Sequence, residues 1–228
     1  MQIQFKLLTV ILLLLFSGTI FAQSLSIVGG GNYTEVDYKQ GSVASAAEDT
    51  YSGKFGFHVG AYLDYVLSKD KSNELVVETG LLFDTKGAKQ EVAVSTLSVE
   101  NNINLYYADI PLYLKYRYRF RSLNKVYIGV GPFVGVGLFG NRTTMQTIEG
   151  ASAEEKAKIR WGSDETQHDM KRLDYGLTGR LGFLSPGGLD ISVSYDYGIP
   201  NIASMGDNIE MKSRVMRLSV GYHFSLVD

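Results

Sequence analysis

The chain has 228 residues, a formal net charge of −2 and no cysteine. The near-neutral charge excludes the basic footprint of a nucleic-acid-binding protein, and the lack of cysteine excludes disulfides, thiolate metal sites and a lipidated N-terminal cysteine. The length suits one domain, and 15 tyrosines and 25 glycines with only 4 prolines favour an all-β fold.

The N-terminal segment has the features of an export signal. Lys6 precedes an apolar run from Leu7 to Phe16, and Ala22 is a small residue suited to a cleavage site. The run is shorter than the about 20 residues that a membrane-spanning helix needs, and no later segment reaches that length. We therefore expect residues 1–22 to be a signal peptide, residues 23–228 to be the mature domain, and any membrane crossing to be made by strands.

An alternation of apolar and polar side chains recurs along the mature chain and is clearest from Val215 to Leu226. Successive side chains of a β-strand point to opposite faces, so each such segment has one apolar and one polar face. The pattern predicts eight strands, near residues 24–34, 53–67, 74–86, 104–120, 125–139, 171–184, 188–198 and 214–226.

The predicted connections alternate between short and long. The short ones are 68–73, 121–124 and 185–187, and the long ones are 35–52, 87–103, 140–170 and 199–213. Short periplasmic turns and long outer loops are typical of outer-membrane barrels. We expect an all-β, eight-stranded antiparallel up-and-down transmembrane β-barrel with both termini in the periplasm.

One face of the predicted strands is apolar and uncharged, whereas the other carries most of their charges. The charged set comprises Lys54, Asp64, Glu78, Asp84, Asp109, Lys115, Arg117, Arg119, Arg172, Asp174, Arg180, Asp190, Asp196 and Arg217. Facing lipid at the bilayer midplane, a lysine or arginine would cost about 2–4 kcal/mol, so this face is expected to point inward. The interior of an eight-stranded barrel is just wide enough for side chains, and an unpaired buried charge is strongly destabilising. The sequence therefore predicts a lumen plugged by paired charges.

Pro111 and Pro132 each remove a hydrogen-bond donor from a predicted strand. The apolar–polar alternation continues through both, which predicts missing hydrogen bonds without a change of register. If the fourth and fifth strands meet at a tight hairpin, Lys115 lies opposite Gly131.

Five segments carry a family resemblance. Residues Tyr107–Tyr116 read Tyr-Ala-Asp-Ile-Pro-Leu-Tyr-Leu-Lys-Tyr, which resembles the Y-x-x-I-P-L-x-x-K-Y segment of the Bacteroidetes-type outer-membrane β-barrel domain family, also called the PorT-like or porin family. Tyr127–Pro132, Asp174–Leu177, Ser194–Ile199 and Leu218–Phe224 resemble further strands of that family. The resemblance implies a location in the outer membrane of a Gram-negative bacterium and insertion by the barrel-insertion machinery. It brings no general catalytic motif.

One cluster in the longest predicted loop could carry chemistry. It consists of Asp164, Glu165, His168 and Asp169. If this stretch is helical, Asp164 and His168 share a face, as metal ligands or an acid/base pair require. The alternative is a solvated surface loop, in which residues 151–160 form either a short charged helix or a mobile segment.

The lumen-facing parity also includes His58 and His223. An imidazole there could gate a pore or sense pH, whereas pairing with Asp or Glu is the structural alternative. Similarly, the inward basic run from Lys115 to Arg119 could attract an anionic solute or be neutralised by carboxylates.

The first functional hypothesis is a small non-enzymatic barrel, without cofactor or metal, that acts through long extracellular loops in binding, adhesion or envelope structure. We expect it to be a monomer surrounded by outer-membrane lipids, with an extracellular or envelope protein as its partner. The alternatives are a narrow pore for small solutes, a membrane-embedded hydrolase or acyltransferase, and a soluble periplasmic barrel with an apolar interior.

Overall fold

The computed structural model describes residues 23–40, 49–94, 97–148, 151–164, 167–204 and 209–226, so the expected signal peptide lies outside the described residues. The strands are β1 (Ser24–Gln40), β2 (Asp49–Ser52), β3 (Lys54–Lys69), β4 (Asn73–Val94), β5 (Leu97–Arg119), β6 (Lys125–Ile148), β7 (Ala151–Lys158), β8 (Leu173–Leu184), β9 (Leu189–Gly198) and β10 (Ile209–Ser225). In this described part of the chain, no helix is long and apolar enough to cross a membrane.

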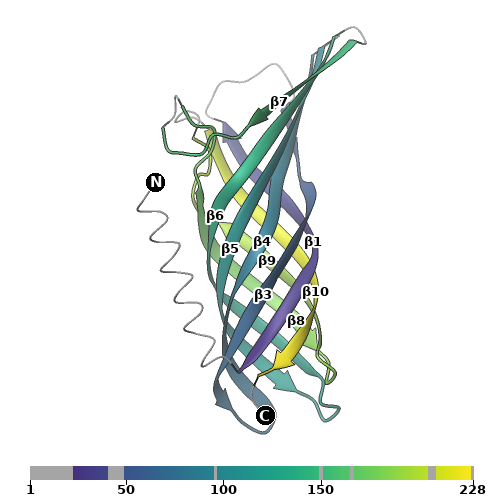
Figure 1. Ribbon diagram of the computed structural model, residues 1–228, viewed down its shortest axis with the longest axis vertical. Coiled ribbons are helices and arrows are strands. Elements are labelled where there is room, and N and C mark those ends of the chain that lie inside the picture. Colours follow the sequence, from purple (N-terminus) through teal and green to yellow (C-terminus); the bar gives the residue numbers. More distant parts are fainter. Residues whose placement is uncertain are drawn as a thin grey trace.

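Eight of these strands close into a barrel (Figure 1). The ring runs β1-β3-β4-β5-β6-β8-β9-β10, all neighbours are antiparallel, and β10 pairs back to β1 from Ser24↔Ser225 to Gln40↔Ile209. Closure gives every wall strand a hydrogen-bonded neighbour on each side, and a hydrocarbon environment requires such pairing of backbone N–H and C=O groups. The prediction of an eight-stranded antiparallel up-and-down barrel is confirmed.

Two hairpins extend beyond the barrel as a tall projection (Figure 1). β4 and β5 stay paired up to Val94↔Leu97, and β6 and β7 pair up to Ile148↔Ala151. Because β5 also pairs with β6, and β2 pairs with β4, these strands form one continuous sheet in the order β2-β4-β5-β6-β7. We call the part of this sheet outside the barrel the protruding sheet.

The protruding sheet corrects three expectations. The expected loops at 87–103 and 140–170 are largely strand, and residues 151–160, expected as a helix or mobile segment, contain β7. The ladders simply continue from the barrel, and continued pairing satisfies backbone groups that a loop would leave to water. Residues 141–147 of β6 carry polar side chains on both faces, because the barrel core no longer selects apolar side chains there, whereas Val99 and Ile103 of β5 keep the alternation.

The opposite end of the barrel holds the short turns between β3 and β4, β5 and β6, and β8 and β9 (Figure 1). The two ends of the described chain meet there. Leu226 N donates to Gln23 O at 2.9 Å, and Gln23 N donates to Asp64 O at 2.9 Å. Barrel closure therefore brings the start of the first strand and the end of the last one together.

The prolines interrupt pairing without shifting it. The β4–β5 and β5–β6 ladders both lose pairs near Pro111, and each resumes in the same register, while β6 and β8 remain in one register through Pro132. The prediction for the prolines is confirmed. The predicted β5–β6 register is wrong by two residues, because Lys115 lies opposite Gly129 instead of Gly131. The turn from Phe120 to Asn124 sets this register.

Candidate functional site

The barrel wall separates an apolar outside from a polar inside. In β8, Leu177 and Leu181 are 61% and 62% exposed, whereas the intervening Arg180 is 3% exposed. A soluble barrel with an apolar interior would have the opposite arrangement, with leucine side chains buried inside and arginine side chains exposed outside. The alternative of a soluble barrel with an apolar interior is therefore wrong.

Most of the charged residues expected in the lumen are buried there, each at most 3% exposed. They are Asp64, Glu78, Asp84, Asp109, Lys115, Arg117, Asp174, Arg180, Asp190, Asp196 and Arg217. Since they come from six wall strands, β3, β4, β5, β8, β9 and β10, their contacts cross the barrel. We divide them into a lower cluster near the short turns and an upper cluster near the protruding sheet.

Three residues of the expected set lie elsewhere. Lys54 reaches over Gly87 to the outer face of the sheet, because β3 stops pairing with β4 beyond His58↔Asp84. Arg119 lies at the short-turn end, where its Nη2 donates to Lys71 O at 2.6 Å. Arg172 precedes β8, is exposed, and donates to the Gly137 carbonyl at 3.1 Å.

Sequence reasoning missed Glu74 and Lys86, which are 3% and 5% exposed and belong to the charged interior. Both share the inward parity of Glu78 and Asp84 on β4. Both residues lie within the predicted strand 74–86, as its first and last residues, so the alternation was a sufficient signal for them. Lys125, at the start of β6, also joins the interior.

The lower cluster consists of Asp64, Glu74, Glu78, Lys115, Arg117, Lys125, Arg180 and Asp190. Lys115 Nζ lies 2.5 Å from Glu78 Oε2 and 3.0 Å from Asp64 Oδ1. Arg180 Nη1 lies 2.7 Å from Glu78 Oε1, so this carboxylate joins cations of two strands. Its four acids and four bases leave the lower cluster formally neutral.

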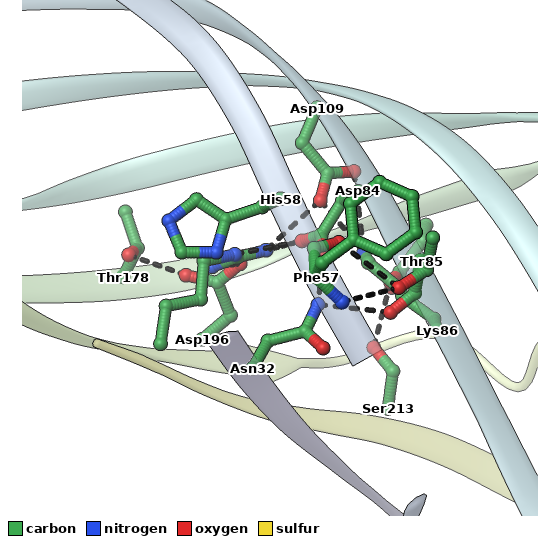
Figure 2. A network of polar contacts seen from close by, with 12 residues as sticks. Asn32, Phe57, His58, Asp84, Thr85, Lys86, Asp109, Thr178, Asp196 and Ser213 are labelled. Atoms are coloured by element: carbon green, nitrogen blue, oxygen red, sulfur yellow. Dashed lines mark hydrogen bonds and ion pairs between the residues drawn. The ribbon is translucent and has the colours of Figure 1, made fainter. Parts of the chain in front are cut away.

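The upper cluster consists of Asp84, Lys86, Asp109, Asp174, Asp196 and Arg217. Figure 2 shows Asp84, Asp109 and Asp196 directed toward one another. Arg217 joins all three: its Nη1 lies 2.6 Å from Asp196 Oδ2, its Nη2 lies 3.0 Å from Asp109 Oδ2, and its Nε donates to Asp84 Oδ2 at 2.7 Å. This guanidinium therefore ties β10 to β4, β5 and β9.

The upper cluster has four carboxylates and only two bases. Neutral donors compensate: Ser213 Oγ donates to Asp174 at 2.6 Å, Thr178 Oγ1 donates to Asp196 at 2.5 Å, and Asn32 donates to Asp84. Hydrogen bonds from neutral groups stabilise ionised carboxylates in a buried site. The sequence suggested that every buried charge has an opposite charge as its partner, but in the upper cluster neutral donors replace some of the cations.

Two apolar layers accompany the charged clusters. Between them lies a buried group of Val28, Tyr62, Leu82 and Tyr113. At the mouth below the protruding sheet lies a second group, which we call the apolar cap: Leu105, Tyr107, Ile159, Met170, Ile202, Ala203 and Met211. The cap combines the end of the barrel wall with the segments that follow β7 and β9.

The structure describes three residues of the predicted loop cluster, Asp164, His168 and Asp169. The Asp164 backbone N–H lies 3.3 Å from His168 Nδ1, so the contact uses the backbone of Asp164, and Glu165 lies outside the described residues. Asp169 is buried in an ion pair with Arg160, which positions the cap. Across the residues that the structure describes, no group of three His, Asp or Glu side chains could hold a metal ion.

The two inward histidines bond to hydroxyl groups and not to carboxylates as expected. His58 Nε2 lies 2.8 Å from Ser219 Oγ, and His223 Nδ1 lies 2.8 Å from Ser26 Oγ. Each contact joins neighbouring parts of the wall. Both imidazoles therefore have a structural hydrogen-bonding partner.

Comparison with known proteins gives one family and several similar folds. Residues 21–204 match the model of the outer membrane protein beta-barrel domain. Similar solved structures include the attachment invasion locus protein Ail of Yersinia pestis, with 15% identity, TM-score 0.36 and coverage of 89% of this chain and 99% of Ail. OprG of Pseudomonas aeruginosa has 16% identity, TM-score 0.43 and coverage of 89% of this chain and 96% of OprG. The neisserial surface protein NspA has 11% identity, TM-score 0.40 and coverage of 89% of this chain and 97% of NspA. No curated protein matches the sequence significantly.

Replacement of Arg217 tests the upper cluster. Arg217→Met leaves three buried carboxylates without their shared cation, and we expect a loss of about 3–5 kcal/mol in the free energy of unfolding. Urea titration, followed by the shift between folded and unfolded bands on gels, measures this. Arg121→Met, in an exposed turn, is the charge-matched control. Adding Asp84→Asn to Arg217→Met should recover part of the loss. If Arg217→Met were as stable as the control Arg121→Met, Arg217 would not have this stabilising role.

Acidification tests the link between Asp169 and the cap. Partial burial acts to raise the pKa of Asp169, but hydrogen bonds and charge from Arg160, with Arg142 nearby, hold that pKa below its ordinary value. A depressed folded-state pKa gives stability that is present above the ordinary pKa and is lost as pH falls below roughly 4. The lone tryptophan, Trp161, packs against the cap. Its emission should stay constant from neutral pH to that point and then shift to the red.

Asp169→Asn provides the matched control for the acid transition. This variant should show shifted Trp161 emission already at neutral pH and no further transition in acid. A wild-type transition that persists unchanged in Asp169→Asn would assign it to another group.

Proposed function

The chain belongs to the outer membrane protein β-barrel domain family, and we propose that it is a non-conducting barrel whose protruding sheet binds a protein outside the cell. Membership places it in the outer membrane of a Gram-negative bacterium as a non-enzymatic membrane protein. The observation that carries the proposal is the continuation of the wall strands into a sheet that is open at its β7 edge.

The filled interior supports a closed lumen. Side chains of the lower cluster, the upper cluster and the two apolar layers succeed one another along the barrel. A water-filled path would have to separate ion pairs such as Lys115–Glu78 and Arg217–Asp196, which lie at 2.5 Å and 2.6 Å. Separation of buried pairs is strongly unfavourable. The narrow solute pore is therefore the second hypothesis.

The orientation follows from the two unlike ends of the barrel. Short turns of outer-membrane barrels face the periplasm, which puts the protruding sheet outside the cell and the mature termini in the periplasm. Residues 1–22 then act as the signal peptide, and the mature domain spans 23–228. Insertion by the barrel machinery and a monomeric state in outer-membrane lipid belong to the same proposal, and no nucleic acid is involved.

Assignment to the Bacteroidetes-type, PorT-like group is a finer proposal. It rests on the motif at Tyr107–Tyr116, which lies within β5. There Asp109 and Lys115 belong to the two charged clusters, and Pro111 marks the interrupted ladders. The motif thus contributes ion pairs to the barrel interior, and this structural role does not depend on a particular partner.

The open edge of β7 supports partner binding. β7 pairs with β6 along Ala151–Lys158, its other edge has no strand partner among the described residues, and its side chains are exposed except for Ala157, which is half-buried. An exposed edge offers backbone N–H and C=O groups to an added strand. Ser152, Glu154, Lys156 and Lys158 on one face would select the partner's side chains.

Site-specific photocrosslinking on intact cells tests orientation and binding together. A photoreactive residue at Ser152 on β7 should give a discrete adduct with a protein of the native surroundings, because this position lies outside the cell at an open edge. The same group at Ser122, in an exposed short turn, is the matched control and should give no adduct with externally added protein.

A second variant separates binding by the sheet from incidental proximity. Replacing residues 142–157 by a two-residue turn shortens the β6–β7 hairpin at the Asn141↔Lys158 pair and leaves the barrel register intact. Adhesion or partner capture should be lost while the folded gel band remains. Full binding by the shortened variant, or adducts from Ser122 alone, would contradict the proposal.

A further inference from the structure

The outer face of the protruding sheet carries charges in bands, and this is the face that continues the lipid-facing wall. Cross-strand register defines the lowest row as Gly87, Asn104, Asn141 and Lys158, with Lys54 lying over Gly87. The next row consists of Lys89, Asn102, Thr143 and Lys156. Each row therefore has lysines at its two ends and amide or hydroxyl groups between them. We call these two rows the lysine band.

An aromatic step lies directly below the lysine band. The rings of Phe83 and Tyr106 stack with centroids 5.9 Å apart, and those of Tyr106 and Phe139 stack at 4.5 Å. Phe139 is 54% exposed. Exposed aromatic rings on a membrane barrel gather at the boundary between hydrocarbon and headgroups. Successive rows on one face are about 7 Å apart along a strand, so the lysine band begins at headgroup level.

An acidic row lies above the lysine band, farther from the membrane. It consists of Glu91, Glu100 and Glu154 with Met145. Two lysines of the upper row pair with it: Lys89 Nζ lies 2.6 Å from Glu100 Oε1, and Lys156 Nζ lies 2.9 Å from Glu154 Oε1. The lysines and glutamates are thus sorted by height and not mixed.

The row nearest the membrane has cations that form no ion pair with any carboxylate that the structure describes. Lys54 Nζ donates to Asn102 Oδ1 at 2.5 Å and to Asn104 Oδ1, and Asn104 Nδ2 donates to Asn141 Oδ1 at 3.0 Å. Among the described residues, no carboxylate forms an ion pair with Lys54 or Lys158. Lys54 is thus held in place by neutral amides, and no carboxylate in the described part of the chain neutralises its charge.

We propose that the lysine band binds the phosphorylated headgroup of a glycolipid in the outer leaflet of the outer membrane. Lys54 and Lys158 would contact phosphate groups, and the asparagines between them would hydrogen-bond sugar hydroxyls. The Lys54 ammonium lies at Asn102 and Asn104 on β5, two strand spacings or about 10 Å from Lys158 on β7, which suits a headgroup that carries more than one phosphate. Basic residues beside an anionic leaflet attract its headgroups.

The acidic row selects the membrane over a soluble polyanion. A polyanion approaching from solution meets Glu91, Glu100 and Glu154 first, whereas a headgroup anchored in the leaflet meets the lysines from below. The rings of the aromatic step would contact the acyl chains of the same lipid just below its headgroup. This inference rests on the proposed orientation but not on partner binding by β7, so the two proposals can fail separately.

Binding of purified lipopolysaccharide to the refolded protein in neutral detergent tests the inference. Removal of both unpaired cations in Lys54→Gln/Lys158→Gln should weaken binding by roughly 25-fold, about fivefold for each lysine. The control Lys69→Gln/Lys71→Gln removes two exposed lysines at the short-turn end and should bind as the wild type does. Phosphatase-treated lipopolysaccharide should bind the wild type with similarly reduced affinity.

The remaining outcomes distinguish the sources of the anion. Equal affinity of all variants for both lipids would show adsorption to the apolar wall and overturn the proposal. Tighter binding of a soluble sulfated oligosaccharide than of lipopolysaccharide would also overturn it. Both double variants should keep the folded gel band, since these lysines lie outside the charged clusters. If the double variant does not fold, Lys158→Gln alone, which removes a side chain without an ion pair, should still weaken binding about fivefold.

Discussion

The structure depends on the pairing of charges inside a narrow barrel. Removing an ion from water costs several kcal/mol, and only close opposite charges and hydrogen bonds offset that cost. Here Arg217 meets three aspartates from three strands, and Lys115 meets carboxylates of β3 and β4. Because each contact joins different strands, the polar interior determines which residues face each other across the barrel.

The same constraint gives the wall its two faces. A slip of one residue in any strand would turn inward charges such as Arg180 toward lipid and apolar residues such as Leu181 toward the lumen. Register is therefore strongly specified within the membrane. Above the apolar cap this selection ends, and the protruding sheet is free to carry polar residues on both faces. The lysine band and the open β7 edge both occupy that unconstrained region.

Much of the barrel could be predicted from the sequence because its alternation has a physical cause. Strand number, antiparallel order, the inward charges and the unchanged register at Pro111 all follow from a two-residue period and the cost of facing charge to lipid. The missed features lie where that cause is weak. β7 has solvent on both faces and carries small alanines where a wall strand has large apolar side chains. Lys54 follows the departure of β3 from β4, and Arg119 and Arg172 stand at strand ends.

The loop acids and histidine show a different limit of sequence reasoning. The spacing of Asp164 and His168 suggested a shared helical face. His168 N does donate to Asp164 O at 2.9 Å, as in a helical turn, but the histidine ring meets the backbone N–H of Asp164. Asp169 belongs to the packing of the cap through Arg160. Spacing alone could not reveal this, because it depends on β7 and on how the following residues close over the barrel.

A closed lumen is the central claim, and single-channel recording tests it most directly. The refolded mature protein, with folding verified by its gel mobility, would be reconstituted in planar bilayers at neutral pH. We expect no conductance steps, since the proposed closed lumen holds the charged clusters and the apolar layers one above another. Reproducible steps from the folded protein would contradict a closed lumen and favour the narrow solute pore.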